Sequence, residues 1–224
     1  MAMGRPVYCG GHRGRYVALT FDDGPGPYTH LALEELRAAH VRATFFLVGR
    51  NLAHHRDLLV RELTLGALGD HTYTHPYLPA LPAASVTGEL ARTQDEITAL
   101  TGQRPELFRP PFGARSSAID RQAQHRGMIE VLWNVDSADA LGAEKNRIAT
   151  NVIAGLQPGS IILMHENRGQ TIVALRRRIL PTLRRRHLQA VTVPELLTLD
   201  PPLPAQLRAG GRGCRVHSSS KPTA

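Results

Sequence analysis

The chain has 224 residues, of which 42% are hydrophobic and 21% charged, as is ordinary for a globular domain with a buried core. No stretch approaches the roughly 18 uninterrupted apolar residues of a membrane-spanning helix, so we expect no membrane span. The net charge of +8 comes almost wholly from arginine, since Lys145 and Lys221 are the only lysines. No aromatic interleaving or docking motif accompanies this charge. The composition therefore argues against a nucleic-acid partner. An anionic polymer such as cell-wall material is the alternative partner for the positive charge.

Strand-like and helix-like segments alternate along the chain. The predicted strands are 16–21, 42–48, 67–70, 128–135, 160–164 and 189–193, together with 106–113, a strand that breaks into a Pro-Pro turn. The predicted helices are 31–40, 51–63, 85–102, 117–126, 145–155, 170–186 and 194–197. We expect Asn51 to cap one helix at its start and Gly102 to end another.

This βα repetition predicts an α/β fold with parallel strands and helices packed outside them. About seven units favour a closed or nearly closed barrel over an open doubly wound sheet, although the pattern alone leaves both open. Neither GxGxxG nor GxxxxGK[ST] follows the first strand, which argues against a nucleotide-binding fold.

The ends of the chain differ from its middle. We predict an N-terminal extension over 1–15, one catalytic domain over 16–197 and a disordered tail over 198–224. Cys9 and Cys214 are too far apart in sequence for a metal motif; they could form a disulfide between the ends, but we favour two unrelated thiols. The N-terminal residues lack the apolar core of a secretory signal, which leaves the compartment open between the cytoplasm and export of a trimmed form.

Polar residues follow five of the predicted strands. In a parallel sheet the C-terminal strand ends meet at one edge, where sites are built. The residues concerned are Asp22, Asp23, His71, His75, Arg109, Asp136, Asp139 and His165. The same pattern after five strands is difficult to attribute to turn chemistry alone.

The segment 71-HTYTH-75 places two histidines at i and i+4, which share one face of a helix. Pro76 disfavours the α region for His75, so any helical turn must end there. Combined with a carboxylate from another strand end, the pair would make a two-His, one-carboxylate set suited to Zn²⁺ or a similar ion.

The pair Asp22-Asp23 and His165 supply what a hydrolytic metal site also needs. One aspartate would ligate the ion while its neighbour, close by but not bound to it, would deprotonate the attacking water. His165 would serve as the acid, held protonated by a nearby aspartate. Arg109 would pair with the base carboxylate, or would, like Asp136 and Asp139, belong to a structural ion-pair network.

Five segments in this order, TFDDGP, HTYTH, RPPFG, WNVDSAD and ILMHE, resemble the signature motifs of the polysaccharide deacetylases, carbohydrate esterase family 4. The resemblance runs from about Val17 to Leu197. It implies a distorted (β/α) barrel, TIM-barrel-like, with fewer than eight complete units. The family includes chitin, chitooligosaccharide and peptidoglycan deacetylases and acetylxylan esterases.

The resemblance also implies a role for each matching residue. Asp22 would be the base, and Asp23, His71 and His75 the metal ligands. Arg109 would orient Asp22, and His165 would protonate the leaving group. The motif that contains Asp136 and Asp139 would tune His165, and of the two we favour Asp136, because it directly follows a predicted strand. The remaining residues implied at the substrate or oxyanion are Phe112, Asp139 and Leu163.

The chain departs from the family pattern at several positions. Ala140 stands where the fourth motif usually has a tryptophan that walls the substrate groove, and we expect Trp133 to be a core residue rather than a substitute. Phe112 replaces a common tyrosine, and Glu166 a common aspartate.

The sequence therefore predicts a metal-dependent hydrolase that removes N-acetyl groups from N-acetylglucosamine units of a peptidoglycan- or chitin-type glycan. We expect one divalent ion, Zn²⁺ before Co²⁺, Fe²⁺ or Ni²⁺, a carbohydrate substrate and a monomer. The alternatives are an O-acetyl esterase on xylan, a deacylase of a small metabolite and, less favoured, a non-catalytic glycan-binding protein.

Overall fold

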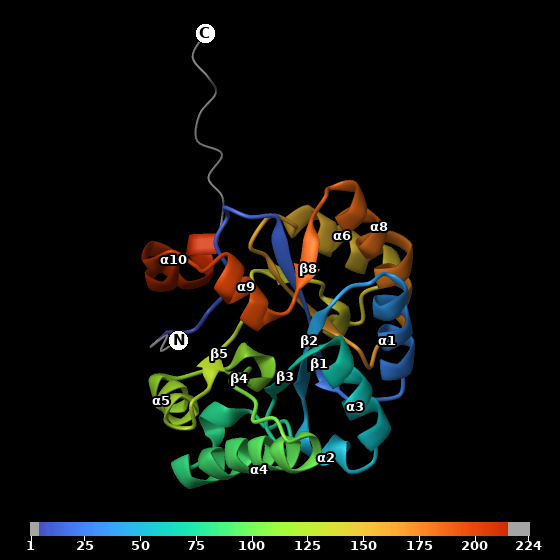
Figure 1. Ribbon diagram of the computed structural model, residues 1–224. Coiled ribbons are helices and arrows are strands. Elements are labelled where there is room, and N and C mark those ends of the chain that lie inside the picture. The colour runs from blue at the N-terminus through green and yellow to red at the C-terminus, as the bar shows by residue number, and fades with distance from the viewer. Residues whose placement is uncertain (1–4, 215–224) are drawn as a thin grey trace.

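The computed structural model describes residues 5–214, and its strands form one parallel sheet that curls into an incomplete barrel (Figure 1). The strand order is β5-β4-β3-β2-β1-β7-β6, and β8 pairs with the start of β1. The strands are β1 (Tyr16–Gly24), β2 (Ala43–Leu47), β3 (Gly66–Asp70), β4 (Leu107–Phe108), β5 (Ile129–Glu130), β6 (Val135–Asp136), β7 (Ile161–His165) and β8 (Gln189–Val191). This curled, incomplete (β/α) barrel confirms the predicted fold class over the doubly wound alternative.

Helices cover the outside of the curled sheet (Figure 1). The α-helices are α1 (Thr29–Ala38), α2 (Gly49–Leu52), α3 (Arg56–Leu65), α4 (Ala83–Thr101), α5 (Ser117–His125), α6 (Lys145–Gly155), α7 (Gly169–Ala174), α8 (Leu180–Arg185), α9 (Val193–Leu199) and α10 (Pro204–Ala209). A π-helical turn, η4 (Leu175–Ile179), joins α7 to α8, and four 3₁₀ turns are η1 (Leu78–Ala80), η2 (Pro111–Gly113), η3 (Asp139–Leu141) and η5 (Gly210–Cys214). None of the helices over residues 5–214 is both long and apolar enough to cross a membrane.

Two helix-end predictions have different outcomes. Gly102 ends α4 in the left-handed conformation (φ +72°), as predicted. The predicted helix 51–63 is instead two helices, α2 and α3, and Asn51 lies inside α2 rather than at an N-cap. Its side chain donates a hydrogen bond to the carbonyl oxygen of Asp23 at 3.1 Å, so its role lies at the end of β1.

The alternation of β1 separates the helix-covered core from the barrel interior. Val17, Leu19 and Phe21 belong to the main hydrophobic cluster that packs under the outer helices. The intervening Ala18 belongs to a second cluster with Phe46, Val131 and Ile161. Because successive side chains of a strand point to opposite faces, Thr20 and Asp22 share the inner face with Ala18. The inner face of β1 therefore leads to Asp22.

The segment predicted as one strand over 128–135 forms two short strands at opposite edges of the sheet, β5 and β6. Residues 131–134 cross the seam between these edges. The N-terminal segment covers the seam, since Val7 bridges to Val131 and Cys9 to Ser160. The predicted extension over 1–15 is thus, where the structure describes it, part of the barrel wall.

The C-terminal segment also packs on the barrel, contrary to the prediction of disorder from residue 198. Asp200 accepts hydrogen bonds from the N–H groups of Arg13 and Gly14. Cys9 and Cys214 form a disulfide with Cα atoms 5.9 Å apart, which corrects the expectation of two unrelated thiols. These contacts join the two ends of the chain and order residues 198–214; the rest of the predicted tail, 215–224, lies outside the described residues.

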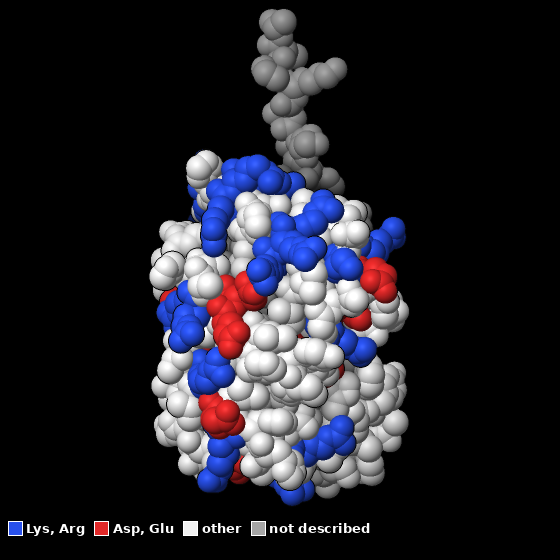
Figure 2. Space-filling model, turned by 90° about the vertical axis from the view of Figure 1, so that its right-hand side faces the viewer, with Lys and Arg blue, Asp and Glu red and all other residues white. Residues whose placement is uncertain are grey.

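The arginine runs 176–178 and 184–186 are exposed on η4 and the end of α8, as expected for a solvated face. On the face shown in Figure 2, basic side chains gather at the end of the molecule where α8 lies in Figure 1. Arg176 forms an ion pair with Glu35 of α1, with 3.6 Å between Nε and Oε1. This positive surface is on the outside of the helical layer.

Candidate active site

Asp22 and Asp23 reach the same site because the strand is irregular between them. Asp22 pairs with Phe46 of β2 and Gly24 with Leu47, so Asp23 is an extra residue in the ladder. Asp23 has a φ of +71°, a left-handed conformation that aspartate tolerates better than most residues. The strand alternation is interrupted at this bulge.

Asp23, His71 and His75 form the group that could hold a metal ion. Their nearest ligand atoms all lie within 4.8 Å of one another. Oδ1 of Asp23 is 3.6 Å from Nε2 of His71 and 3.2 Å from Nε2 of His75. This Oδ1 is buried without a hydrogen-bond partner among the described residues, and a cation would satisfy it. A carboxylate with two imidazoles is the donor set of catalytic zinc sites, which keep a position open for water or substrate.

The histidine-bearing segment is a loop rather than the helical turn considered from its spacing. Thr72 and His75 have φ values of +67° and +62°, and the two imidazole centroids are 5.0 Å apart. Glu89 of α4 holds the loop by accepting hydrogen bonds from the N–H groups of Tyr73 and Thr74. The loop thus brings the two rings together without a shared helical face.

The protonation of His71 also suits a metal ligand. Its Nδ1 lies 2.7 Å from the carbonyl oxygen of Arg109, which makes Nδ1 the donor and leaves Nε2 with a free lone pair toward Asp23. Burial lowers the pKa of His71 to about 3, so the ring is neutral at physiological pH. Neutral imidazole is the form that binds metals.

Arg109 is completely buried and connects Asp22 to the seam of the barrel. Its Nη1 donates to Oδ1 of Asp22 at 2.7 Å and to Oγ1 of Thr20 at 2.8 Å. Its Nε and Nη2 donate to the carbonyl oxygens of Val131 and Leu132 in the crossing segment, at 3.0 and 3.1 Å. Burial raises the pKa of Asp22 above its ordinary value, although the guanidinium opposes this rise.

His165 pairs with Asp139, not with Asp136 as we expected. Nδ1 of His165 is 2.7 Å from Oδ1 of Asp139, and Oδ2 of Asp139 accepts hydrogen bonds from the His165 N–H and the Thr171 hydroxyl. Burial alone would lower the pKa of His165, but the bond to Asp139 and the negative charges of Asp22, Asp139 and Asp23 raise it to about 9. His165 is therefore protonated at neutral pH.

The turn of the chain after β6 explains why Asp139, rather than Asp136, bonds to His165. Ala138 adopts a left-handed conformation (φ +59°) and redirects the chain into η3, which carries Asp139 into the interior. Asp136 is left exposed, where it accepts hydrogen bonds from the Ala138 N–H and from Nε1 of Trp133.

A cavity of about 510 Å³ lies at the C-terminal ends of the strands, and most of the predicted site residues face it. The predicted site residues that line it are Asp22, Asp23, His71, His75, Phe112, Asp136, Leu163 and His165. Trp133 is half-buried: it packs against the second hydrophobic cluster, as expected of a core residue, but it also lines the cavity, which we did not expect. Ala140 is exposed on the rim, where its methyl group adds little wall.

Comparison with known proteins agrees with this geometry. A family model described as polysaccharide deacetylase matches residues 10–131, which is more than half of the chain. This chain belongs to the polysaccharide deacetylase family. Members of the family are hydrolases. The family and the group of Asp23, His71 and His75 both indicate a divalent metal ion.

Relatives of this polysaccharide deacetylase differ in substrate. A peptidoglycan-N-acetylglucosamine deacetylase of Bacillus cereus is 32% identical over 195 residues, covering 85% of this chain and 71% of that protein. A bifunctional xylanase/xylan deacetylase of Cellvibrio japonicus is 40% identical over 152 residues, covering 67% of this chain and 23% of that protein. A solved peptidoglycan N-acetylglucosamine deacetylase, in complex with 4-naphthalen-1-yl-N-oxidanyl-benzamide, superimposes with a TM-score of 0.83 at 30% identity, covering 89% of this chain and 95% of that one.

Sequence reasoning missed a pair of buried carboxyl groups behind the deacetylase site. Glu62 of α3 and Glu166, next to His165, are both completely buried, and none of their four oxygens accepts a hydrogen bond within residues 5–214. Burial and mutual repulsion raise the pKa of Glu62 well above its ordinary value, and burial raises that of Glu166 to about 7. Gly24 fits against Glu166 only because it lacks a side chain: a Cβ there would lie 1.6 Å from Oε1.

Other contributors escaped the sequence analysis because they act through hydrogen bonds rather than through a motif. Thr20 supports Arg109, Asn51 the Asp23 backbone, Glu89 the histidine loop and Thr171 the Asp139 carboxylate. Thr20 is the first residue of the TFDDGP motif and could have been suspected from its place on the inner face of the first strand. The other three lie on helices with no signal for a role at the site.

Proposed function

We propose that this deacetylase removes N-acetyl groups from N-acetylglucosamine units of a peptidoglycan- or chitin-type glycan. The observation that carries the proposal is the placement of Asp23, His71 and His75 between a buried carboxylate, Asp22, and a protonated imidazole, His165. Hydrolysis of an amide requires a base for the water and an acid for the departing amine, and these two groups supply them.

Asp23, His71 and His75 would hold one divalent ion, with Zn²⁺ as our first expectation and Co²⁺, Fe²⁺ or Ni²⁺ as alternatives. The ion would act as a Lewis acid, polarising the acetyl carbonyl and making water more acidic. The unsatisfied Oδ1 of Asp23 and the free Nε2 of His71 support this assignment.

Asp22 is the proposed base. Its Oδ1 is held by Arg109, while Oδ2 lies 3.7 Å from Nε2 of His71, on the side of the ligand group. Arg109 fixes the direction of the carboxylate, and the burial that raises its pKa makes it a stronger acceptor of the proton from water.

His165 is the proposed acid. With Nδ1 bonded to Asp139, the proton on Nε2 is the one available to the leaving nitrogen. The register of the sheet supports this role, because Asp22 of β1 pairs with His165 of β7 and the two side chains begin from adjacent backbone positions. Asp139 is thereby a positioning residue.

Phe112 and Leu163 would receive the acetyl group. We propose that the backbone N–H of Phe112 helps to stabilise the oxyanion, since this residue lies in the loop at η2, lines the cavity and is 69% exposed. Leu163, directly before the buried Met164 of β7, offers apolar surface to the acetyl methyl group.

O-deacetylation of xylan is the second candidate function. The relative of Cellvibrio japonicus, whose name includes xylan deacetylase, supports it with the higher identity of 40%. Base, metal ligands and acid would serve an ester as well as an amide, so the choice depends on how the sugar fits the cavity.

Acetate release from chitopentaose, peptidoglycan and acetylated xylan tests the proposal. The protein would be assayed after chelation and again after addition of Zn²⁺ or Co²⁺. We expect metal-restored release from chitopentaose or peptidoglycan. Release from xylan alone would establish the second candidate instead, and release from none by the metal-loaded protein would refute both.

A further inference from the structure

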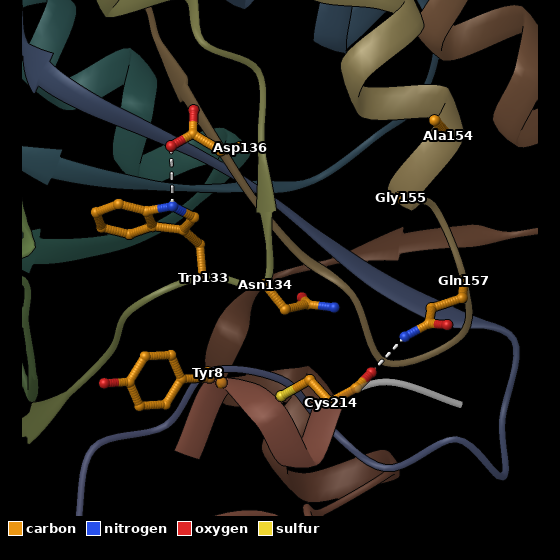
Figure 3. A pocket seen from close by; sticks show the side chains of 9 residues that line it. Tyr8, Trp133, Asn134, Asp136, Ala154, Gly155, Gln157 and Cys214 are labelled. Carbon is orange, nitrogen blue, oxygen red and sulfur yellow. Dashed lines mark hydrogen bonds between the residues drawn. The ribbon is translucent and has the colours of Figure 1, made fainter. Parts of the chain in front are cut away.

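A second cavity, of about 610 Å³, adjoins the catalytic one. Figure 3 shows the residues that line it. Trp133 and Asp136 line both cavities, so the two meet at this hydrogen-bonded pair. The second cavity follows the seam between β5 and β6, from Asp136 at the end of β6 to Gln157 ahead of β7. Its size is within the range of small-ligand sites, roughly 300–1,000 Å³.

Small residues create this hollow. Ala154 and Gly155 end α6 on one side, and Gly211 belongs to η5 on the other. Tyr8 flanks the cavity with its ring against the backbone of η5, since a Cβ on Gly211 would lie 3.3 Å from the ring. The cavity therefore has two aromatic residues, Tyr8 and Trp133, along one side of the seam (Figure 3).

Two side-chain amides supply hydrogen-bonding groups. Asn134 accepts a hydrogen bond from the Ile161 N–H through Oδ1, at 2.8 Å, which fixes the amide and leaves Nδ2 as a donor. Gln157 donates through Nε2 to the Cys214 carbonyl oxygen, which leaves Oε1 as an acceptor. In Figure 3 the Asn134 side chain extends across the cavity toward the side where Gln157 lies.

We propose that this cavity binds an uncharged pyranose unit of the same glycan chain that lies beyond the direct neighbour of the unit being deacetylated, so that a pentamer reaches it and a dimer does not. The proposal rests on the proposed function. Aromatic rings present an apolar face to the C–H groups of a sugar ring, and a fixed donor and acceptor match its hydroxyl and acetamido groups. Among the described residues that line the cavity, Asp136 alone is charged. An N-acetylglucosamine unit therefore fits better than a sugar acid, which Asp136 would repel.

The test fills the cavity from an exposed position. Ala154→Phe places a ring in the hollow at the end of α6, and Ala38→Phe is the matched control, an exposed alanine in the last turn of α1. Metal-loaded wild-type and variant proteins would be compared for kcat/KM of acetate release from diacetylchitobiose and pentaacetylchitopentaose. A thermal melt of each variant would confirm folding.

We expect the wild type and Ala38→Phe to prefer the pentamer by about tenfold or more, a factor equal to about 1.4 kcal/mol. Ala154→Phe should lose this preference while its kcat/KM for the dimer stays unchanged. The proposal is overturned if Ala154→Phe keeps the wild-type preference, or if the wild type has none.

A binding measurement separates failure of this cavity from failure of the proposed function. Trp133 is the one tryptophan of the chain and lines both cavities, so its fluorescence reports occupancy. If no acetate is released but pentamer binding is weakened by Ala154→Phe and not by Ala38→Phe, the second cavity stands and the proposed activity fails. If pentamer binding is equal in the two variants, the second cavity fails whatever the activity.

Discussion

Asp22 and Asp23 are neighbours in sequence with opposite surroundings. Asp22 is 3% exposed and bonded to a buried guanidinium, whereas Asp23 sits in a bulge with Oδ1 turned toward two imidazoles. Substituting either aspartate by asparagine keeps the shape and removes the charge. The two variants should therefore separate proton transfer from metal binding.

We expect Asp22→Asn to bind Co²⁺ as the wild type does and to lose about 10²–10⁴ in kcat, the usual contribution of a general base. Asp23→Asn should lose the ion and the activity together, because one of the three proposed ligands is gone. Metal content after gel filtration and kcat for acetate release measure the two effects. Near-full activity of Asp22→Asn would exclude it as the base.

His165 depends on Asp139 for its proton. Its pKa is raised to about 9, so the acid form is complete at neutral pH and is lost as the pH rises through that value. Asp139→Asn removes a charge and weakens the bond to Nδ1, so the pKa should fall toward its ordinary value and activity should fall at lower pH than in the wild type.

The alkaline limb of kcat/KM against pH measures this shift. Asp136→Asn is the matched control, because Asp136 is three residues away but bonds to Trp133 and the Ala138 N–H instead. Its alkaline limb should stay at the wild-type pH. The assignment of Asp139 would be refuted if Asp136→Asn moved the limb and Asp139→Asn did not.

Among the elements, those with long apolar runs or strong periodicity could be predicted within a few residues, as for β1, β2, α4 and α6. The strands β4, β5 and β6 have two residues each, and their pairing depends on where the sheet ends rather than on local pattern. Convergence of the strand-end residues could be inferred from parallel topology. The pairing of His165 with Asp139 instead of Asp136 could not be inferred, because it depends on the left-handed conformation of Ala138, for which the sequence gives no signal.

Glu62 of α3 and Glu166, directly after β7, place two buried carboxyl groups near each other. Both folded-state pKa values are raised above the ordinary 4.5, that of Glu166 to about 7. Groups with raised pKa values bind protons on folding, so their contribution to stability is complete below about pH 4.5 and is lost as the pH rises through the folded values. The free energy of unfolding should therefore decrease from pH 5 to pH 8.

Glu62→Gln should weaken this dependence, because a neutral amide can donate a hydrogen bond to Glu166. At pH 8 we expect the variant to be more stable than the wild type by an amount on the order of 2 kcal/mol, and at pH 5 to be similar. Urea unfolding across this range measures the effect, with the exposed Glu34→Gln as the control. Parallel pH dependences for the two variants would show that the buried pair is not responsible.

For the whole molecule, the barrel is completed by the two ends of the chain. Val7 and Cys9 bridge the seam, Asp200 holds the backbone at Arg13 and Gly14, and the disulfide joins Cys9 to Cys214 across 205 residues of sequence. Such bonds persist in oxidising compartments. A cross-link over so long a loop restricts the unfolded chain strongly, and removal of a native disulfide typically costs about 2–5 kcal/mol.

Reduction of the wild type should therefore lower the free energy of urea unfolding by about 2–5 kcal/mol. The double variant Cys9→Ser, Cys214→Ser should match the reduced wild type and be insensitive to reductant. Gln157 and Cys214 both line the second cavity, and Gln157 bonds to the Cys214 carbonyl oxygen. Loss of the disulfide should therefore free residue 214 and reduce the preference for the pentamer. The dimer, which relies on the strand-end site, should still be turned over. Two titratable thiols in protein purified without reductant would contradict the bond, and an unchanged unfolding curve on its reduction would contradict its role in stability.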